Sequence, residues 1–330
     1  MTALFAAALA LSAAAQTRAA PAPAPGPAHL VIITGLGGEP GYRAALQEWS
    51  TSLAGAGRRL GIPEDRIIRL AGDSAAGSGA RRATRENVGR ALEALAGRTR
   101  RDDLVFIFLA GHGSHEGPES RLNLPGPDLT AAEMGRLLES LAGRRLVVVN
   151  ASSASGDFVA ALSAPGRVII TATKTSLERN ATQFGGRFVA AYAVDGADAD
   201  KDGRVSLLEA FLFAKRETAR AYAADNRLLT EHALLDDDGD QAGSVAPGAD
   251  GADGALARTV FLGAAPAAYA EGDSRGAELA AQKRGLEERI AALRARKASL
   301  PPEDYESQLE TLLVDLALTN EALRARSGTR

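Results

Sequence analysis

One histidine and one serine stand where two strongly apolar segments of the chain end. His112 follows the apolar run 104–110, and Ser153 follows the run 146–150. Such runs, bounded by turn residues, are typical of strands buried on both faces of a parallel sheet, whose ligands bind beyond the carboxyl ends of the strands. The imidazole could there act as a general base for the serine hydroxyl, and the backbone N–H of Gly113 could hold the resulting oxyanion.

Both residues also have simpler interpretations. A histidine between two glycines can occupy a surface turn, and three serines within residues 152–155 are typical of a turn without chemistry. The chain has no cysteine, which excludes disulfides, thiolate metal sites and a cysteine nucleophile.

Residues 198–209 have oxygen ligands at the spacing of an EF-hand calcium loop. The candidate ligands are Asp198, Asp200, Asp202, the carbonyl of Arg204, Ser206 directly or through a water, and a bidentate Glu209. Gly203 permits the sharp turn, and residues 188–194 and 207–222 can form the flanking helices. We predict a bound Ca²⁺ that stabilises the fold. The alternative is an exposed acidic loop, which is also the default interpretation of the weaker cluster 236–240.

The hydrophobic pattern predicts the elements that position these residues. Apolar segments typical of strands occupy 30–34, 67–70, 104–110, 146–150 and 168–173, with a late apolar stretch at 259–262. Apolar residues at helical spacing occur in much of the intervening chain. Thr84 and Thr130 are expected to be N-caps, the latter in a capping box with Glu133. Strands that alternate with helices predict an α/β domain with a mostly parallel sheet, over residues 28–264.

The two ends of the chain differ from this domain. Residues 1–20 have the apolar core and small-residue site of a signal peptide, and residues 21–27 are an Ala/Pro linker, so we expect a secreted or periplasmic protein. The alternative is a disordered, alanine-rich terminus. Residues 265–330 contain apolar residues at heptad-like spacing on both sides of Pro301 and Pro302, which predicts a coiled-coil-like α-helical hairpin that could self-associate.

Charge and loop composition exclude several other functions. A net charge of −3 gives no basis for nucleic-acid binding. No further apolar run is long enough for a transmembrane segment in the mature chain. The glycine loop after residue 34 fails the dinucleotide-binding pattern, because Pro40 stands in place of its third glycine.

The order of these motifs resembles the caspase-like peptidases, most closely the legumain-type branch of the caspase/gingipain clan and its bacterial relatives. That family has its histidine in a Gly-His-Gly turn, which His112 matches, and its nucleophile in an Ala-Cys-x-Ser-Gly turn after the next strand. Alignment on Ser155-Gly156 puts Ser153 at the cysteine. The resemblance covers residues 30–235 and implies a caspase-like three-layer sandwich that acts on peptide or protein substrates.

The missing cysteine leaves three functional alternatives open. A thiol is partly ionised near neutral pH, whereas a hydroxyl needs full general-base help. The chain could be a Ser–His dyad hydrolase using Ser153 and His112, or a catalytically inactive pseudopeptidase that binds peptide. It could also be a calcium-binding structural or interaction protein of the cell envelope.

Overall fold

The computed structural model describes most of the chain. The described residues are 26–73, 79–117, 119–194, 196–200, 203–248, 253–263, 274–295 and 300–327. The predicted signal peptide and nearly all of the predicted Ala/Pro linker lie outside these ranges, so both stay predictions.

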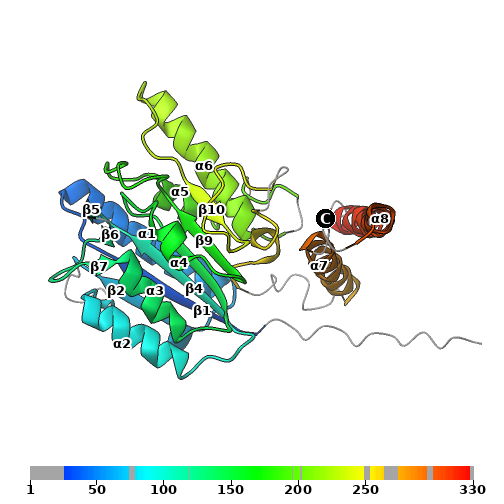
Figure 1. Cartoon of the computed structure of the whole chain (residues 1–330), viewed down its shortest axis with the longest axis horizontal. Helices are drawn as coiled ribbons and strands as arrows, with labels where there is room; N and C mark the ends of the chain where they lie inside the picture. Colours follow the sequence, from blue (N-terminus) through cyan, green and yellow to red (C-terminus); the bar gives the residue numbers. More distant parts are fainter. Residues whose placement is uncertain are drawn as a thin grey trace, which may run out of the picture.

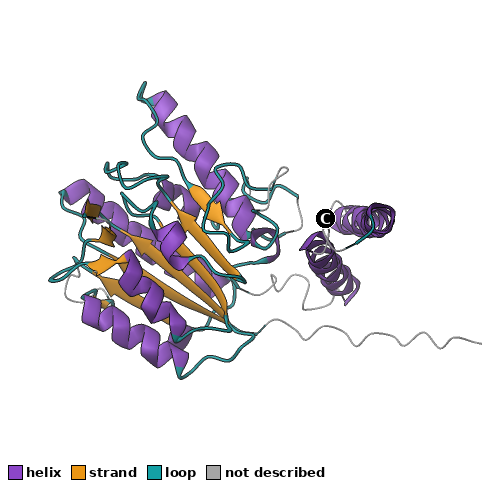
Figure 2. Cartoon of the chain, viewed as in Figure 1, coloured by secondary structure: helices purple, strands orange, loops and turns teal. Residues whose placement is uncertain are grey.

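A seven-stranded sheet forms the centre of the main domain (Figures 1 and 2). Its spatial order is β10 (Leu234–Asp236), β9 (Arg167–Thr171), β8 (Arg145–Asn150), β4 (Leu104–Ala110), β1 (Ala28–Thr34), β2 (Ile67–Ala71) and β3 (Arg81–Arg82). Neighbouring strands are parallel, except that β10 runs antiparallel to β9. Every residue of the central strand β4 is buried, which explains why its sequence is apolar without alternation.

Helices cover both faces of the sheet, as the alternating pattern predicts. One face packs against α1 (Pro40–Arg59), α5 (Phe184–Ala190) and α6 (Leu207–Ala224), and the other against α2 (Arg85–Ala96), α3 (Ala131–Glu139) and α4 (Phe158–Leu162). Alternate residues of β1 serve the two cores, with Ile32 in the first and Ile33 in the second. The domain is therefore the predicted three-layer α/β sandwich.

The predicted helix starts are confirmed at two threonines. Thr84 accepts a hydrogen bond from the backbone N–H of Asn87 at the start of α2. Thr130 and Glu133 form the reciprocal capping box of α3. Both signals are local in sequence, which is why they could be predicted.

Several short elements differ from the prediction. A second, antiparallel sheet of β5 (Gly113–Glu116), β6 (Glu119–Leu122) and β7 (Leu129–Thr130) occupies a segment expected to be a loop. The apolar stretch 259–262 is not a strand of the sheet, because it follows the 3₁₀ turn η2 (Ala257–Thr259) and makes a single bridge from Phe261 to Ser206. A further 3₁₀ turn, η1 (Glu64–Arg66), precedes β2.

Two expectations about the acidic segments also need correction. The helix before the predicted calcium loop is α5, which ends at Ala190, whereas residues 188–194 were expected. The cluster 236–240 is not simply an exposed loop, because Asp236 belongs to β10 and both Asp236 and Asp237 are buried. Pairing of β10 with β9 carries these carboxylates into the domain.

Two long helices follow the main domain, α7 (Ser274–Ala295) and α8 (Pro302–Ser327). They pack on one another through an apolar cluster at the predicted positions: Leu286, Ile290, Leu293, Tyr305 and Leu312. Self-association through this pair stays a prediction. Among the described residues, every helix falls short of the length and apolar character needed to cross a membrane.

Candidate functional site

The carboxyl ends of β4 and β8 meet at one edge of the sheet, as predicted. The two strands are parallel neighbours, with Leu109 opposite Asn150. The chain then turns at Gly111, whose φ of +144° favours glycine, and continues into β5. The turns of His112 and Ser153 thus meet at this edge of the sheet, which is called the crevice below.

Ser153 is 0% exposed, and its hydroxyl is bonded to a peptide group of the opposite turn. The hydroxyl oxygen accepts a hydrogen bond from the N–H of Gly113 at 2.9 Å and donates to the carbonyl of Gly113 at 3.3 Å. A Cβ at position 113 would lie 2.1 Å from the carbonyl oxygen of Ser153, so this approach requires glycine. The predicted oxyanion donor is therefore occupied by the predicted nucleophile.

The imidazole of His112 has a different environment. Its ring lies 5.0 Å from the ring of Tyr42, tilted by 50°, and Gly38 leaves room for its Nε2 edge. Its backbone N–H donates to Leu36, and its carbonyl accepts from Asn123. Within the described part of the chain, no hydrogen bond joins this imidazole to the hydroxyl of Ser153. The predicted pair shares the crevice but is not coupled.

Tyr42 connects the histidine to a neighbouring groove. Its hydroxyl donates to the carbonyl of Gly111 at 3.3 Å and lies 3.4 Å from the hydroxyl of Thr182, and burial raises its pKa to about 12. Its ring meets the ring of Trp49 edge-on at 5.8 Å. Tyr42, Trp49 and Thr182 line a cavity of about 780 Å³ between α1 and α5. The sequence analysis did not identify this tyrosine, because its role depends on tertiary contacts.

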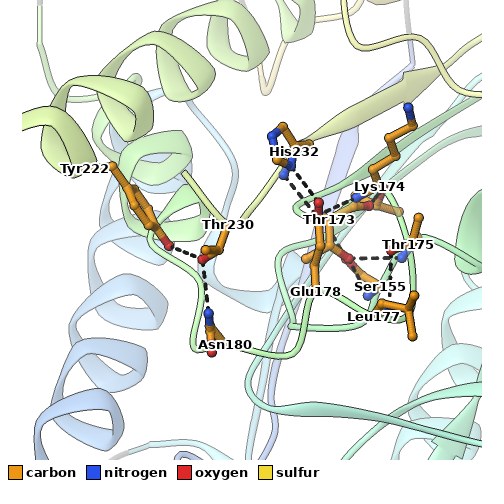
Figure 3. Close-up of polar contacts among 12 residues, drawn as sticks. Ser155, Thr173, Lys174, Thr175, Leu177, Glu178, Asn180, Tyr222, Thr230 and His232 are labelled. Atoms are coloured by element: carbon orange, nitrogen blue, oxygen red, sulfur yellow. Dashed lines mark hydrogen bonds and ion pairs between the residues drawn. The ribbon is translucent and has the colours of Figure 1, made fainter. Parts of the chain in front are cut away.

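The other two serines of the turn have structural roles. Ser152 donates both its backbone N–H and its hydroxyl to the side-chain oxygen of Asn150. Ser155 exchanges hydrogen bonds with Thr173, with its backbone N–H 2.7 Å from the threonine oxygen (Figure 3). Gly156 donates to the same oxygen. The turn that carries Ser153 is thereby fixed to the loop after β9.

Glu178 holds the next part of this loop. One carboxylate oxygen lies 2.6 Å from Nδ1 of His232, and the other accepts the backbone N–H groups of His232 and Lys174 (Figure 3). The backbone carbonyl of Glu178 accepts the N–H of Ala154, a residue with φ of +51° next to Ser153. The wall of the crevice is therefore tied to the segment that leads into β10.

A second histidine also faces the crevice region. Nδ1 of His115 lies 3.2 Å from a carboxylate oxygen of Asp157, which also accepts the hydroxyl of Ser120 at 2.7 Å. The side chain of His115 is only 23% exposed. The sequence does not indicate this cluster, because the three residues come from β5, β6 and the start of α4.

The predicted calcium loop brings together three of its predicted ligands. Asp198, Asp200 and Glu209 each present a carboxylate oxygen within 4.8 Å of the others. Gly203 has φ of +82° and donates its N–H to Asp198. Ser206 is the N-cap of α6 and forms a capping box with Glu209. The converging oxygens fit a hard divalent cation.

The remaining predicted ligands are placed less directly. Asp202 lies outside the described residues. The guanidinium of Arg204 stacks on Phe261 at 3.6 Å and donates to the carbonyl of Gly263. The hydroxyl of Ser206 donates to Glu209 at 2.8 Å.

A lysine from the C-terminal helices reaches this loop. Lys283 of α7 is buried, and its Nζ lies 2.5 Å from a carboxylate oxygen of Asp200 and 3.8 Å from Glu287. The ammonium group is therefore a built-in cation beside the predicted calcium ligands. No local sequence pattern indicates this contact, because position 283 is more than seventy residues from the loop.

Comparison with known proteins gives one family match and distant structural similarities, two of which are described here. Residues 85–227 match the Peptidase C13 family. Protein GSU0716 from Geobacter sulfurreducens is 13% identical, with a TM-score of 0.43 and coverage of 64% of this chain and 93% of that chain. The Drosophila initiator caspase Dronc is 11% identical, with a TM-score of 0.42 and coverage of 71% and 84%. None of the curated proteins matches.

The matched segment contains both sides of the crevice, since it begins at α2 and ends just after α6. It includes the Gly-His-Gly turn after β4 and the serine-rich turn after β8, in the order of the legumain-type peptidases. The sheet around these turns has the predicted three-layer α/β arrangement. Residues 85–227, which carry both turns of the crevice, are therefore similar to the Peptidase C13 family.

Proposed function

We propose that this protein is a calcium-binding pseudopeptidase, a caspase-like domain that binds peptide segments beside its former catalytic crevice without cleaving them. The single observation that carries the proposal is the state of Ser153. Its hydroxyl is fully buried, accepts a hydrogen bond from the backbone N–H of Gly113 and donates one to the backbone carbonyl of Gly113.

This arrangement removes two requirements of serine catalysis. A hydroxyl becomes a useful nucleophile when a base within hydrogen-bonding distance takes its proton, and the imidazole of His112 makes no such bond to Ser153 in the described structure. The tetrahedral intermediate needs free N–H donors, and the N–H of Gly113 is already bonded to the hydroxyl. Peptide binding requires neither condition.

The groove beside His112 supports the binding part of the proposal. Tyr42 and Trp49 contribute aromatic surface, and Gln183 and Arg187 contribute polar groups to the same cavity. Apolar and aromatic walls with a few polar groups are typical of ligand sites.

Calcium at residues 198–209 is the second part of the proposal. The oxygens of Asp198, Asp200 and Glu209 converge, and the loop joins α5 to α6, which pack on the same face of the sheet. A cation there would neutralise the carboxylates and hold the two helices together. Modest affinity would suit export of the protein, because extracellular calcium modules bind at roughly 0.1–1 mM.

The catalytic question is tested by labelling with a fluorophosphonate, which modifies activated serines. We expect no labelling of the folded protein. Labelling of Ser153 that is lost in both Ser153→Ala and His112→Ala would overturn the proposal in favour of the Ser–His hydrolase. That second candidate rests on the shared crevice, in which the turn of His112 directly contacts Ser153.

Peptide binding is tested by the fluorescence of Trp49, the single tryptophan of the chain. A library of synthetic peptides in solution should include members that shift its emission in a saturable way. Tyr42→Ala should weaken this binding, whereas Arg136→Ala, on α3 at the opposite face of the sheet, is the matched control. Absence of any saturable shift would contradict the binding role.

A further inference from the structure

Three carboxylates converge at the edge strand of the sheet, apart from the loop 198–209. Asp236 ends β10, Asp238 follows it, and Asp253 reaches the same point from a later segment. One oxygen from each lies within 4.8 Å of the others. Asp236 is 0% exposed and Asp253 is 5% exposed, so two of the three carboxylates are removed from water.

The carboxylate of Asp236 is only half satisfied. Its Oδ1 accepts the backbone N–H of Gly239 at 3.2 Å, while its buried Oδ2 has no hydrogen-bond partner among the described residues. A buried anionic oxygen without a donor is costly, and in native proteins such an atom needs a specific explanation. A bound cation supplies one.

The neighbouring residue shows that this strand can satisfy a carboxylate with backbone donors. Both oxygens of Asp237 are bonded, one to the N–H of Gly254 at 2.8 Å and the other to the N–H of Ala257 at 2.7 Å. Asp237 thus clamps the later segment to β10. Backbone donors therefore satisfy the carboxylate of Asp237 but not Oδ2 of Asp236, which belongs to the cluster.

The same backbone bonds hold the cluster in place. The N–H of Asp237 donates to Asp253 at 3.0 Å, which fixes that carboxylate next to β10. Leu235 and Ser244 exchange two backbone hydrogen bonds, so the chain between them forms a closed loop that contains Asp238. The three oxygens are positioned by bonds that need no cation.

No positive group of the described residues neutralises the cluster. None of the three carboxylates forms an ion pair with an arginine, lysine or histidine in the described ranges. Their acidic neighbour Asp237 adds charge of the same sign. Converging carboxylates of this kind repel one another unless a cation or a proton lies between them.

We propose that Asp236, Asp238 and Asp253 form a second divalent-cation site, occupied by Ca²⁺ and independent of residues 198–209. The donor set consists of oxygen alone, which selects hard cations over zinc or copper. Asp238 is exposed, so water can complete the large, flexible coordination shell that Ca²⁺ prefers. The ion would join β10 to the segment that leads into η2.

Calorimetric titration with Ca²⁺ separates this site from the first. Glu209→Gln removes the bidentate ligand of the loop 198–209, and we expect this variant still to bind one equivalent of Ca²⁺. Adding Asp238→Asn should weaken the remaining binding about tenfold or more, because ligand charge tunes calcium affinity. Asp240→Asn is the matched control, since this exposed carboxylate in the same loop lies outside the cluster. Loss of all binding in Glu209→Gln alone, with the fold intact by circular dichroism, would overturn the second site.

A melting experiment on Asp236→Asn tests the buried ligand independently, through the direction in which the melting temperature changes. Asp236→Asn should raise the melting temperature in chelator, because it removes a buried unpaired anion, and lower it in Ca²⁺, because it removes a ligand. A shift of the same sign in both conditions would show that Asp236 does not bind the ion.

Discussion

Two regions of the domain hold their polar groups in different ways. One is the crevice at the ends of β4 and β8. The other is the acidic side, which consists of the loop 198–209 and the cluster of Asp236, Asp238 and Asp253. In the crevice, hydroxyl and peptide groups satisfy one another, as Ser153 does with Gly113 and Ser155 does with Thr173. The side-chain nitrogen of Asn150 is an exception, since it is buried and has no hydrogen-bond partner in the described part of the chain. On the acidic side, carboxylate oxygens converge, and Oδ2 of Asp236 has no hydrogen-bond donor among the described residues.

This difference shows which region requires a ligand. Donors and acceptors that pair internally are stable without a ligand, so the crevice can keep its shape without one, as the proposed loss of catalysis requires. The buried Oδ2 of Asp236 has no donor among the described residues, and the folded state gains from a cation that binds it together with the neighbouring carboxylates. The predictions below test this contrast, from the largest expected effect to the smallest.

Removal of calcium should produce the largest effect. A ligand at one hundred times its dissociation constant stabilises by about 2.7 kcal/mol per site, so two sites would raise the melting temperature by roughly 10 °C or more for a domain of this size. Differential scanning calorimetry in Ca²⁺ and in chelator measures this shift. Glu209→Gln should remove about half of it, and an equal melting temperature in both buffers would contradict both cation sites.

The closed state of the crevice is tested by thiol protection. Because the chain has no cysteine, Ser153→Cys and Ser152→Cys each introduce a single thiol. Both positions are buried, so we expect iodoacetamide to react with both at similar rates, at least about a hundredfold slower than in the unfolded chain. A thiol at position 153 that reacts a hundredfold faster than the thiol at 152, and slows again with His112→Ala, would show an active dyad and break the contrast.

The sequence predicts the features that depend on local pattern and strand order, but not the side-chain contacts within the site. The central strands, the caps at Thr84 and Thr130 and the neighbouring ends of β4 and β8 were predicted correctly, because each depends on local pattern or on the rule that successive strands are neighbours. Whether Ser153 bonds to an imidazole or to a peptide group depends on side-chain geometry within a few ångströms. No sequence pattern specifies that choice.

The buried acidic cluster was missed for a different reason. Strand β10 has three residues, too few for a periodic signal, and its acidic end resembles a solvated loop. Burial of Asp236 results from pairing with β9, and the place of Asp253 results from a bond to a residue sixteen positions earlier. Such contacts are set by tertiary structure.

A pH experiment in the absence of calcium tests the repulsion within the cluster. Burial, together with the facing carboxylates of Asp238, Asp237 and Asp236, raises the pKa of Asp253 from 3.8 to about 6. The folded state therefore holds this proton more tightly than the unfolded state, so stability is lost as the pH rises from about 4 to about 6. Compared with Asp253→Asn, the wild type should lose stability across this range in chelator. A difference in the free energy of unfolding that stays constant over this pH range would contradict the repulsion. Asp240→Asn controls for the loss of one charge.

Lys283 should give the smallest effect, because it tests how far an internal cation already satisfies the first loop. Its ammonium group pairs with Asp200, so Ca²⁺ must compete with it for that carboxylate. Partly exposed ion pairs contribute at most about 1 kcal/mol, so Lys283→Gln should tighten Ca²⁺ binding at residues 198–209 by up to about fivefold. Arg275→Gln, an exposed residue of the same helix, is the control and should leave the affinity unchanged. Weaker binding in Lys283→Gln would show that α7 supports the loop, and the acidic side would then differ from the crevice less than we propose.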